Sequence, residues 1–158
     1  MKTVQTIDNT LLDQVSAAAL ASTRRRKNLN FHASDAAACH RLLNAIEPGS
    51  YIQPHRHLDP AKDETILLLR GKLGFVSFDG AGSVIDTCVL AAGGALLGLT
   101  VPSGVFHTLF ALEPGCVFFE SKAGPYQPLT PDEKAAWAPA EGESGATPYL
   151  SSLQALFA

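Results

Sequence analysis

The chain has 158 residues, and its 12 lysines and arginines against 15 aspartates and glutamates give a formal net charge of −3. This length suits one compact domain, and the charge balance provides no general field for nucleic acid or an anionic membrane, so we expect a small-molecule partner. No stretch approaches the roughly 20 apolar residues that cross a bilayer, and the N-terminus lacks the order of a signal peptide, which indicates a cytoplasmic protein.

The first predicted element is an amphipathic helix over residues 8–23, with Asp8 or Asn9 as its N-cap. Its apolar residues form one stripe: Leu11, Leu12, Val15, Ala18 and Ala19. A small domain must cover such a stripe itself or share it with a second subunit, and we therefore expect a homodimer. The basic run "RRRK" that follows is interpreted as a solvated helix end rather than a nucleic-acid contact.

Between residues 38 and 122 the sequence changes to short runs rich in β-branched and aromatic residues. Turns such as "EPGS", "RGK" and "DGAGS" separate these runs at intervals that suit hairpins. Many short antiparallel strands indicate a sandwich or a barrel. Its core is expected to hold the phenylalanines and three reduced cysteines that form no CxxC pair: Phe75, Phe78, Phe106, Phe110, Phe118, Phe119, Cys39, Cys88 and Cys116.

The tail from Gly124 onward contains five prolines and is expected to lie mostly irregular over the surface. Helical fragments are predicted near residues 131–138 and 149–157. The large apolar side chains of Trp137 and Phe157 are expected to fix this tail to the rest of the molecule.

The stretch "SYIQPHRH", residues 50–57, is a strand candidate whose alternation places two histidines on one face. Side chains two residues apart on a strand stand about 6 to 7 Å apart, so His55 and His57 can converge on one ion. Glu64, at the start of the next strand, can reach back to the pair with a carboxylate. Asp63 is the rival carboxylate.

A fourth ligand is expected from "VPSGVFHTL", where a turn containing proline and glycine delivers His107 to the start of another strand. Three histidines and one carboxylate suit one divalent first-row metal, and zinc, iron, manganese and nickel all fit. Tyr51 and Gln53 share the predicted face of the histidines and are candidates to orient the metal-bound imidazoles. Together with Lys122 they form the predicted catalytic set.

Two segments keep alternative interpretations. Glu120 and Lys122 are either an ion pair at the rim of the pocket or a catalytic acid and base. The segment "NLNFH", residues 28–32, is either a connector into the barrel or a stretch through which Asn30 or His32 reaches the mouth of the pocket.

The spacing of eight residues resembles the two motifs of the cupin superfamily: Gly49, His55, His57, Glu64, Gly71, Pro102, Gly104 and His107. Six residues separate His57 from Glu64 where the superfamily has three or four, and Leu96 replaces an expected glycine. A longer resemblance, through "RRRKNLNFH", "PHRH", "KDET", "PSGVFHTL" and "FFESKAGPY", is to the WbuC-type cupin fold metalloproteins. These bacterial proteins are associated with O-antigen and other surface-polysaccharide gene clusters.

The resemblance implies a mainly β, single-domain cupin, that is, a double-stranded β-helix or jelly-roll barrel with an N-terminal helical arm. The expected divisions are an arm over residues 1–34, a barrel over 35–124 and a surface-packing tail over 125–158. Two function classes follow. One is a metal-dependent isomerase or epimerase acting on a small polar substrate such as a sugar or sugar nucleotide, with an iron-dependent dioxygenase as its near neighbour. The other is a non-catalytic small-molecule-binding or sensor cupin, and we favour the enzyme.

Overall fold

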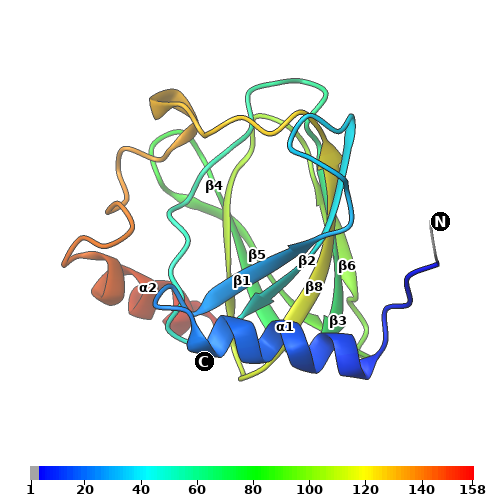
Figure 1. The fold of residues 1–158 in the computed structure, drawn as a ribbon. Helices are drawn as coiled ribbons and strands as arrows, with labels where there is room; N and C mark the ends of the chain where they lie inside the picture. The colour runs from blue at the N-terminus through cyan, green and yellow to red at the C-terminus, as the bar shows by residue number, and fades with distance from the viewer. Residues whose placement is uncertain (1–3) are drawn as a thin grey trace.

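A computed structural model describes residues 4–158 as a barrel of antiparallel strands with a helix near each end of the chain (Figure 1). In chain order its elements are α1 (Asn9–Ala21), β1 (Arg26–Asn30), β2 (Cys39–Ile46), β3 (Glu64–Arg70), β4 (Lys72–Phe78), β5 (Val84–Ala91), β6 (Gly98–Val101), β7 (Phe106–Ala111), β8 (Cys116–Ala123), η1 (Pro131–Glu133), α2 (Ala146–Gln154) and η2 (Ala155–Phe157). None of the helices between residues 4 and 158 has the length and apolar character needed to span a bilayer.

Two antiparallel sheets form the barrel, one with strand order β1-β2-β8-β3-β6 and one with order β5-β4-β7. Gly71 separates β3 from β4 with a φ of 86°, and a Cβ atom there would lie 2.6 Å from the sulfur of Cys116. This close approach explains why glycine stands at the turn. The apolar side chains between the sheets form the main core and come from strands of both sheets.

Helix α1 confirms the predicted amphipathic helix, and the side chain of Asp8 caps it by accepting a hydrogen bond from the Leu11 amide at 2.9 Å. Its stripe packs on the outer face of β2 and β8 within the same chain, through Leu12, Val15, Ala19, Leu43, Ala45 and Val117. The barrel therefore covers most of the predicted stripe, with Leu11 half-buried and Ala18 exposed, and the sequence argument for a homodimer through this helix no longer applies.

Strand β1 lies inside the segment that was expected to be an arm. It pairs with β2 from Arg26 opposite Ile46 to Asn30 opposite Leu42, so the barrel begins at Arg26 rather than at residue 35. The strand was missed because its residues facing the cavity are polar, which hides the apolar alternation that usually identifies a strand.

Residues 50–57 are not a regular strand, and this prediction was wrong. Only His55 forms isolated antiparallel bridges, one to His107 and one to Lys134. Proline has no amide hydrogen to donate to a ladder, and the Pro54 carbonyl instead accepts a hydrogen bond from Ala135 in the C-terminal tail. Without strand alternation, Ile52 lines the central cavity, and Tyr51 packs with a different apolar cluster on the tail.

The C-terminal tail is irregular apart from η1, α2 and η2, which lie in or near the predicted helical fragments. The Trp137 ring lies 4.9 Å from Phe78 and 5.9 Å from Phe106 between centroids, and Phe157 lies 5.5 Å from Phe110. These contacts confirm the two predicted anchors.

Most of the predicted core residues are buried, and three are not: Phe119, Cys88 and Cys39. Phe119 is half-buried against the α1 cluster. The three cysteines are free, but only Cys116 is fully buried; Cys88 is half-buried, and Cys39, the first residue of β2, is exposed. The prediction of Cys39 as a core residue was wrong because at this position β2 turns its side chain to solvent.

Candidate metal centre

Two histidines and one glutamate gather at one end of the barrel. These residues are His55, His57 and Glu64, and their ligand atoms all lie within 4.8 Å of one another. Nε2 of His57 lies 3.0 Å from Oε2 of Glu64. Glu64 opens β3 and is only 5% exposed, because the alternation of β3 turns it to the same buried side as Ile66.

His107 lies beside this group as the second residue of β7. Its backbone exchanges two hydrogen bonds with His55, at 3.0 and 2.9 Å, and the two ring centroids are 4.7 Å apart. The ring centroid of His57 is 6.3 Å away, and His107 is 2% exposed. The structure thus brings three of the four predicted ligands into one compact group, and the fourth, His107, lies next to this group.

Backbone carbonyls orient two of the imidazoles. Nδ1 of His55 donates to the Gln53 carbonyl at 3.1 Å, and Nδ1 of His107 donates to the Val105 carbonyl at 2.9 Å. With the proton on Nδ1, the lone pair of Nε2 is available to a metal. Burial lowers the pKa of His55 to about 3, with His107 adding to the effect, and burial also lowers the pKa of His107, so both rings are neutral near pH 7.

Glu64 is ionised in this setting. Burial alone would raise its pKa, but the hydrogen bond from His57 and the charge of Lys122 outweigh burial and hold the pKa below its ordinary value. Asp63, the rival carboxylate, is exposed and accepts a hydrogen bond from the Ser103 amide at 2.9 Å. The carboxylate of the group is therefore that of Glu64.

Tyr51 and Gln53 direct their side chains to the C-terminal tail rather than to the histidines. The Tyr51 hydroxyl donates to the Pro139 carbonyl at 2.8 Å, and the Gln53 amide donates to the carbonyls of Ala135 and Ala138 at 3.0 and 3.3 Å. The expected orienting role belongs instead to the backbone carbonyl of Gln53 and to that of Val105. The reason is the loss of strand alternation in residues 50–57.

Lys122 and Glu120 lie on β8 next to the group. The ammonium nitrogen of Lys122 is 2.7 Å from Oε1 of Glu120 and 3.7 Å from Oε2 of Glu64. Asn44 of β2 donates to the other oxygen of Glu120 at 2.7 Å. Burial raises the pKa of Glu120 to about 7, and the charge of Glu64 acts in the same direction. Burial lowers the pKa of Lys122, but Glu64 and Glu120 reverse this and raise it above its ordinary value.

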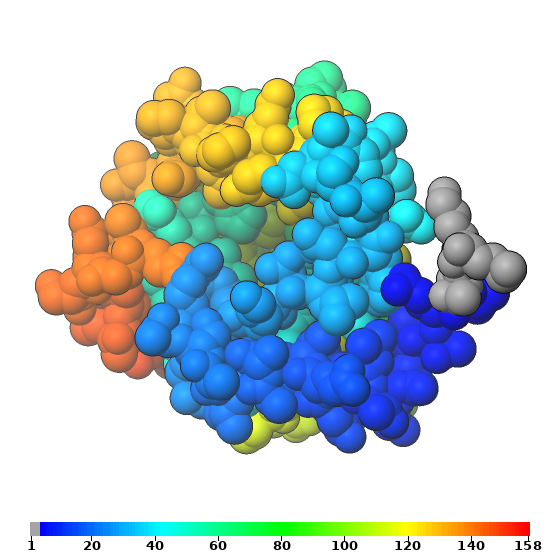
Figure 2. Space-filling view, in the orientation of Figure 1, coloured from blue at the N-terminus to red at the C-terminus, as the bar shows by residue number. Residues whose placement is uncertain are grey.

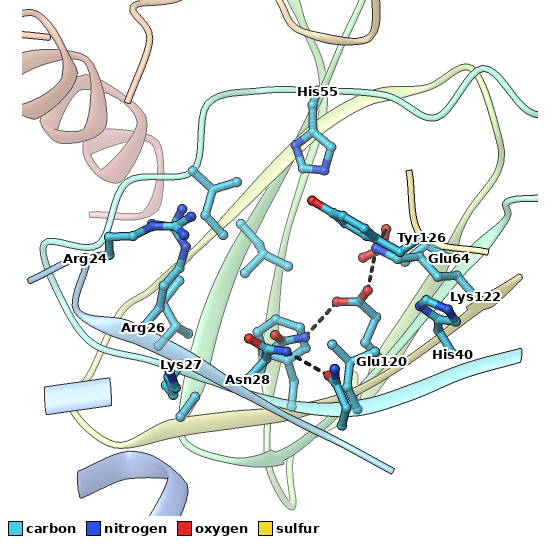
Figure 3. Close-up of a pocket in the computed structure, with 18 of the residues that line it drawn as sticks. Arg24, Arg26, Lys27, Asn28, His40, His55, Glu64, Glu120, Lys122 and Tyr126 are labelled. Carbon is cyan, nitrogen blue, oxygen red and sulfur yellow. Dashed lines mark hydrogen bonds and ion pairs between the residues drawn. The ribbon is translucent and has the colours of Figure 1, made fainter. Parts of the chain in front are cut away.

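These groups line a cavity of about 640 Å³ inside the barrel. Figure 3 shows His55, Glu64, Glu120 and Lys122 around it. In the space-filling view the surface is hollowed between the blue N-terminal segments and the yellow segment that follows β8 (Figure 2). Both Asn30 and His32, whose role the sequence left open, line the cavity.

Sequence reasoning missed several polar residues that line the same cavity: Arg26, Asn28, His40 and Asn44. None belongs to a recognisable motif. Their common signal is alternation, since Asn28 pairs opposite Asn44 and His40 opposite Lys122 across adjacent strands. That signal becomes readable only when the pairing of β1, β2 and β8 is known.

The donor set fits a divalent transition metal. The neutral imidazoles of His55 and His107, whose Nε2 atoms are directed away from the backbone carbonyls, together with the ionised, buried carboxylate of Glu64, are the kinds of ligand that such ions take in proteins.

A family model described as a domain of unknown function (DUF6016) matches residues 7–90. The chain belongs to the DUF6016 family. The match to DUF6016 includes α1 to β4, most of β5 and the three residues of the compact group, and it ends before His107. No curated protein matches the sequence significantly.

Solved structures similar to this DUF6016 member show its fold. A conserved protein of unknown function from Streptococcus pyogenes has a TM-score of 0.53 at 12% identity, over 80% of this chain and 93% of the other. KdgF from Halomonas sp. has a TM-score of 0.51 at 14% identity, over 68% and 85%. Oxalate decarboxylase from Bacillus subtilis has a TM-score of 0.46 at 21% identity, over 57% of this chain and 22% of that protein. KdgF is a cupin, and the mainly β barrel with its N-terminal helix is a cupin fold.

Proposed function

We propose that this protein is a metal-dependent enzyme that binds one divalent ion through His55, His57, Glu64 and His107. The substrate is a small polar molecule such as a sugar or sugar nucleotide, and the reaction is an isomerisation, an epimerisation or a related lyase step. One observation carries the proposal: three of the candidate ligands, His55, Glu64 and His107, line a cavity of about 640 Å³ together with the ion pair of Glu120 and Lys122. This volume lies within the usual range for small-molecule sites.

A bound divalent ion would supply Lewis acidity, polarising a carbonyl or hydroxyl oxygen of the substrate. The chain supplies the groups that move protons. Burial and the charge of Glu64 raise the pKa of Glu120 to about 7, so this group can take or give a proton at neutral pH, while Asn44 and Lys122 hold its two oxygens in place. Lys122 stays charged and stabilises negative charge that develops on the substrate.

The resemblance to WbuC-type cupins supports a role in surface-polysaccharide metabolism, and this finer assignment rests on the sequence motifs alone. A passive binding or sensor cupin would use the same cavity, but it would have no need of a buried acid paired with an ammonium group beside the ligands. The Glu120 and Lys122 pair therefore favours turnover over passive binding.

The test begins with elemental analysis of protein purified without added metal. Nucleotide sugars are then screened for conversion with the zinc-loaded protein and with the protein loaded with iron under anaerobic conditions. We expect about one equivalent of metal and conversion of at least one compound. Tight binding of a nucleotide sugar without conversion in both metal forms would contradict the enzyme and favour the sensor. Turnover by the iron form only after oxygen is admitted would contradict the isomerase and favour a dioxygenase.

A further inference from the structure

The cavity has a second polar end, which the proposed metal centre does not use. Arg24 and Arg26 line it, with Lys27 beside them, at the beginning of β1. In the register of the sheet, Arg26 lies opposite Ile46, whereas Glu64 lies opposite Lys122 at the other end of the strands. Figure 3 shows these three cations on the side of the cavity away from Glu64 and Lys122.

A carboxylate from the C-terminal tail holds two of the cations side by side. Glu141 accepts from Nε of Arg24 at 2.8 Å through one oxygen and from Arg26 at 2.6 Å through the other. Arg26 also donates to the Tyr51 carbonyl at 3.0 Å, which fixes its guanidinium group. With Glu141 as their shared carboxylate, the two arginines leave an excess of one positive charge at this end of the cavity. Lys27 lies opposite Ala45, which packs against α1, so its side chain is on the other face of β1 and its charge acts only at longer range.

The backbone between the two arginines is strained. Arg25 has a φ of 53°, a left-handed conformation that residues other than glycine seldom adopt. Its Nε atom donates to the Pro48 carbonyl at 2.8 Å, which holds the strained turn in place. The Arg25 side chain thus fixes the turn, and the turn positions Arg24 and Arg26 so that both bind the carboxylate of Glu141.

Amide groups continue from the cations towards the metal centre. Asn28 and Asn30 follow Arg26 at two-residue intervals and line the same cavity, and Asn28 lies opposite Asn44 of β2. Asn44 in turn binds Glu120. Side-chain amides both donate and accept hydrogen bonds, so this row suits a ligand that carries hydroxyl groups.

We propose that Arg24 and Arg26 form a subsite for a phosphate group, so that the substrate is a phosphorylated sugar lying along β1. Its phosphate rests on the two arginines, its hydroxyls face the asparagines, and its reacting carbon faces Glu64 and Lys122. The excess positive charge attracts a phosphate monoester or a diphosphate bridge, and guanidinium groups bind phosphate oxygens in pairs. This subsite deepens the proposed function and rests on it for the position of the reacting carbon.

The test compares glucose 1-phosphate, glucuronate and glucose by isothermal titration calorimetry on the metal-loaded protein at low ionic strength. Glucose 1-phosphate is expected to bind, and glucuronate and glucose at least about tenfold more weakly. Arg24→Gln, at a side chain 62% exposed, should weaken binding of glucose 1-phosphate about tenfold. Glu141→Gln should strengthen it several-fold, because it removes the carboxylate that competes with phosphate for the arginines.

Arg70→Gln is the matched control, since Arg70 pairs with Asp13 outside the cavity, and its binding should equal that of the wild type. The subsite is overturned if Arg24→Gln and Glu141→Gln change the affinity for glucose 1-phosphate in the same direction, or if neither variant changes it. Equal binding of glucuronate and glucose 1-phosphate would also overturn it. If Arg24→Gln fails to fold by circular dichroism, Arg24→Lys takes its place and should weaken binding several-fold, because an ammonium group does not bind two phosphate oxygens in a fixed pair.

Binding is also measured in His57→Ala, which removes one proposed metal ligand. If His57→Ala still binds glucose 1-phosphate, and adding Arg24→Gln to it weakens that binding, the phosphate subsite acts independently of the ion. If His57→Ala no longer binds glucose 1-phosphate, the subsite is overturned. A wild-type protein that takes up no metal but binds glucose 1-phosphate in this manner would contradict the proposed function and leave the subsite standing. Metal uptake and turnover that Arg24→Gln leaves unchanged would support the proposed function and contradict the subsite.

Discussion

His57 and Glu64 meet at 3.0 Å although six residues separate them in the sequence, two or three more than the superfamily pattern has. A turn absorbs the added length: the amide of Lys62 donates to the Asp59 carbonyl at 2.9 Å. Lys62 also anchors the turn by donating through its side chain to the Pro125 carbonyl at 3.0 Å. The insertion therefore lengthens the loop without displacing the carboxylate from the imidazole.

This contact leads to a prediction about metal content. His57→Ala and Glu64→Gln should each lower the bound metal from about one equivalent to well below a tenth, because each removes one ligand from a compact set. Asp63→Asn is the matched control, since that carboxylate binds the Ser103 amide, and it should keep full metal content. Elemental analysis after gel filtration measures all three, and a full equivalent in Glu64→Gln would remove the glutamate from the site.

The candidate ligands were predictable from the sequence because each follows from a local pattern. His55 and His57 come two residues apart, Glu64 opens a strand of clear alternation, and His107 follows a turn at the start of another strand. The strand assigned to residues 50–57 was wrong, yet the two histidines still converge, because the antiparallel bridge of His55 to His107 holds the segment against β7.

The cavity wall was not predictable in the same way. β1 carries Arg26, Asn28 and Asn30 towards a polar cavity, so the strand lacks the apolar alternation by which strands are recognised. Tyr51 was assigned to the histidine face by an alternation that Pro54 interrupts. Both errors have one cause: periodicity reports which residues face an apolar core, and it does not report an internal polar pocket or a segment whose backbone pairs with a distant tail.

Lys122 is predicted to matter for turnover rather than for metal binding. Its ammonium nitrogen lies 2.7 Å from Glu120 and 3.7 Å from Glu64, within reach of a substrate in the cavity. Lys122→Met should reduce kcat by about a hundredfold or more on the substrate found by the screen, with metal content retained. Lys72→Met, on the exposed first position of β4, is the control. Unchanged kcat in Lys122→Met would reject its catalytic role.

Tyr51 and Gln53 are predicted to act on stability. Tyr51→Phe and Gln53→Leu each remove side-chain hydrogen bonds to tail carbonyls, so each should lower the free energy of unfolding by about 1 kcal/mol. Metal content and kcat should stay near wild-type values, because the backbone carbonyl of Gln53 remains in place to orient His55. Urea denaturation measures the loss. A large fall in kcat with unchanged stability would instead restore the catalytic role expected from the sequence.

A homodimer remains a prediction, although α1 packs most of its stripe on its own barrel. The edge strand β5 exposes Val84, Ile85 and Val89, with Ile85 66% exposed. An apolar edge strand is a surface that a second copy can cover. Light scattering at protein concentrations of about tens of micromolar should show a dimer, and Ile85→Lys should shift it towards monomer. Wild-type protein that scatters only as a monomer would contradict the prediction.

Glu120 is predicted to make the stability of the metal-free protein fall as the pH rises. Burial, assisted by Glu64 and opposed by Lys122, raises its pKa from 4.5 to about 7. Between these values the folded state binds more protons than the unfolded state, so this carboxyl lowers stability with rising pH through that window. Glu120→Gln resembles the protonated acid and lacks the effect.

Urea denaturation of chelator-treated protein at pH values from about 5 to 8 tests this linkage. The stability of Glu120→Gln relative to wild type should increase across the range and then level off above the raised pKa of Glu120, near 7. Glu113→Gln controls for removal of an exposed carboxylate on the loop before β8. A relative stability that decreases with pH would mean that Lys122 dominates over burial, and Glu120 would then be a permanently ionised partner of Lys122 rather than a proton carrier.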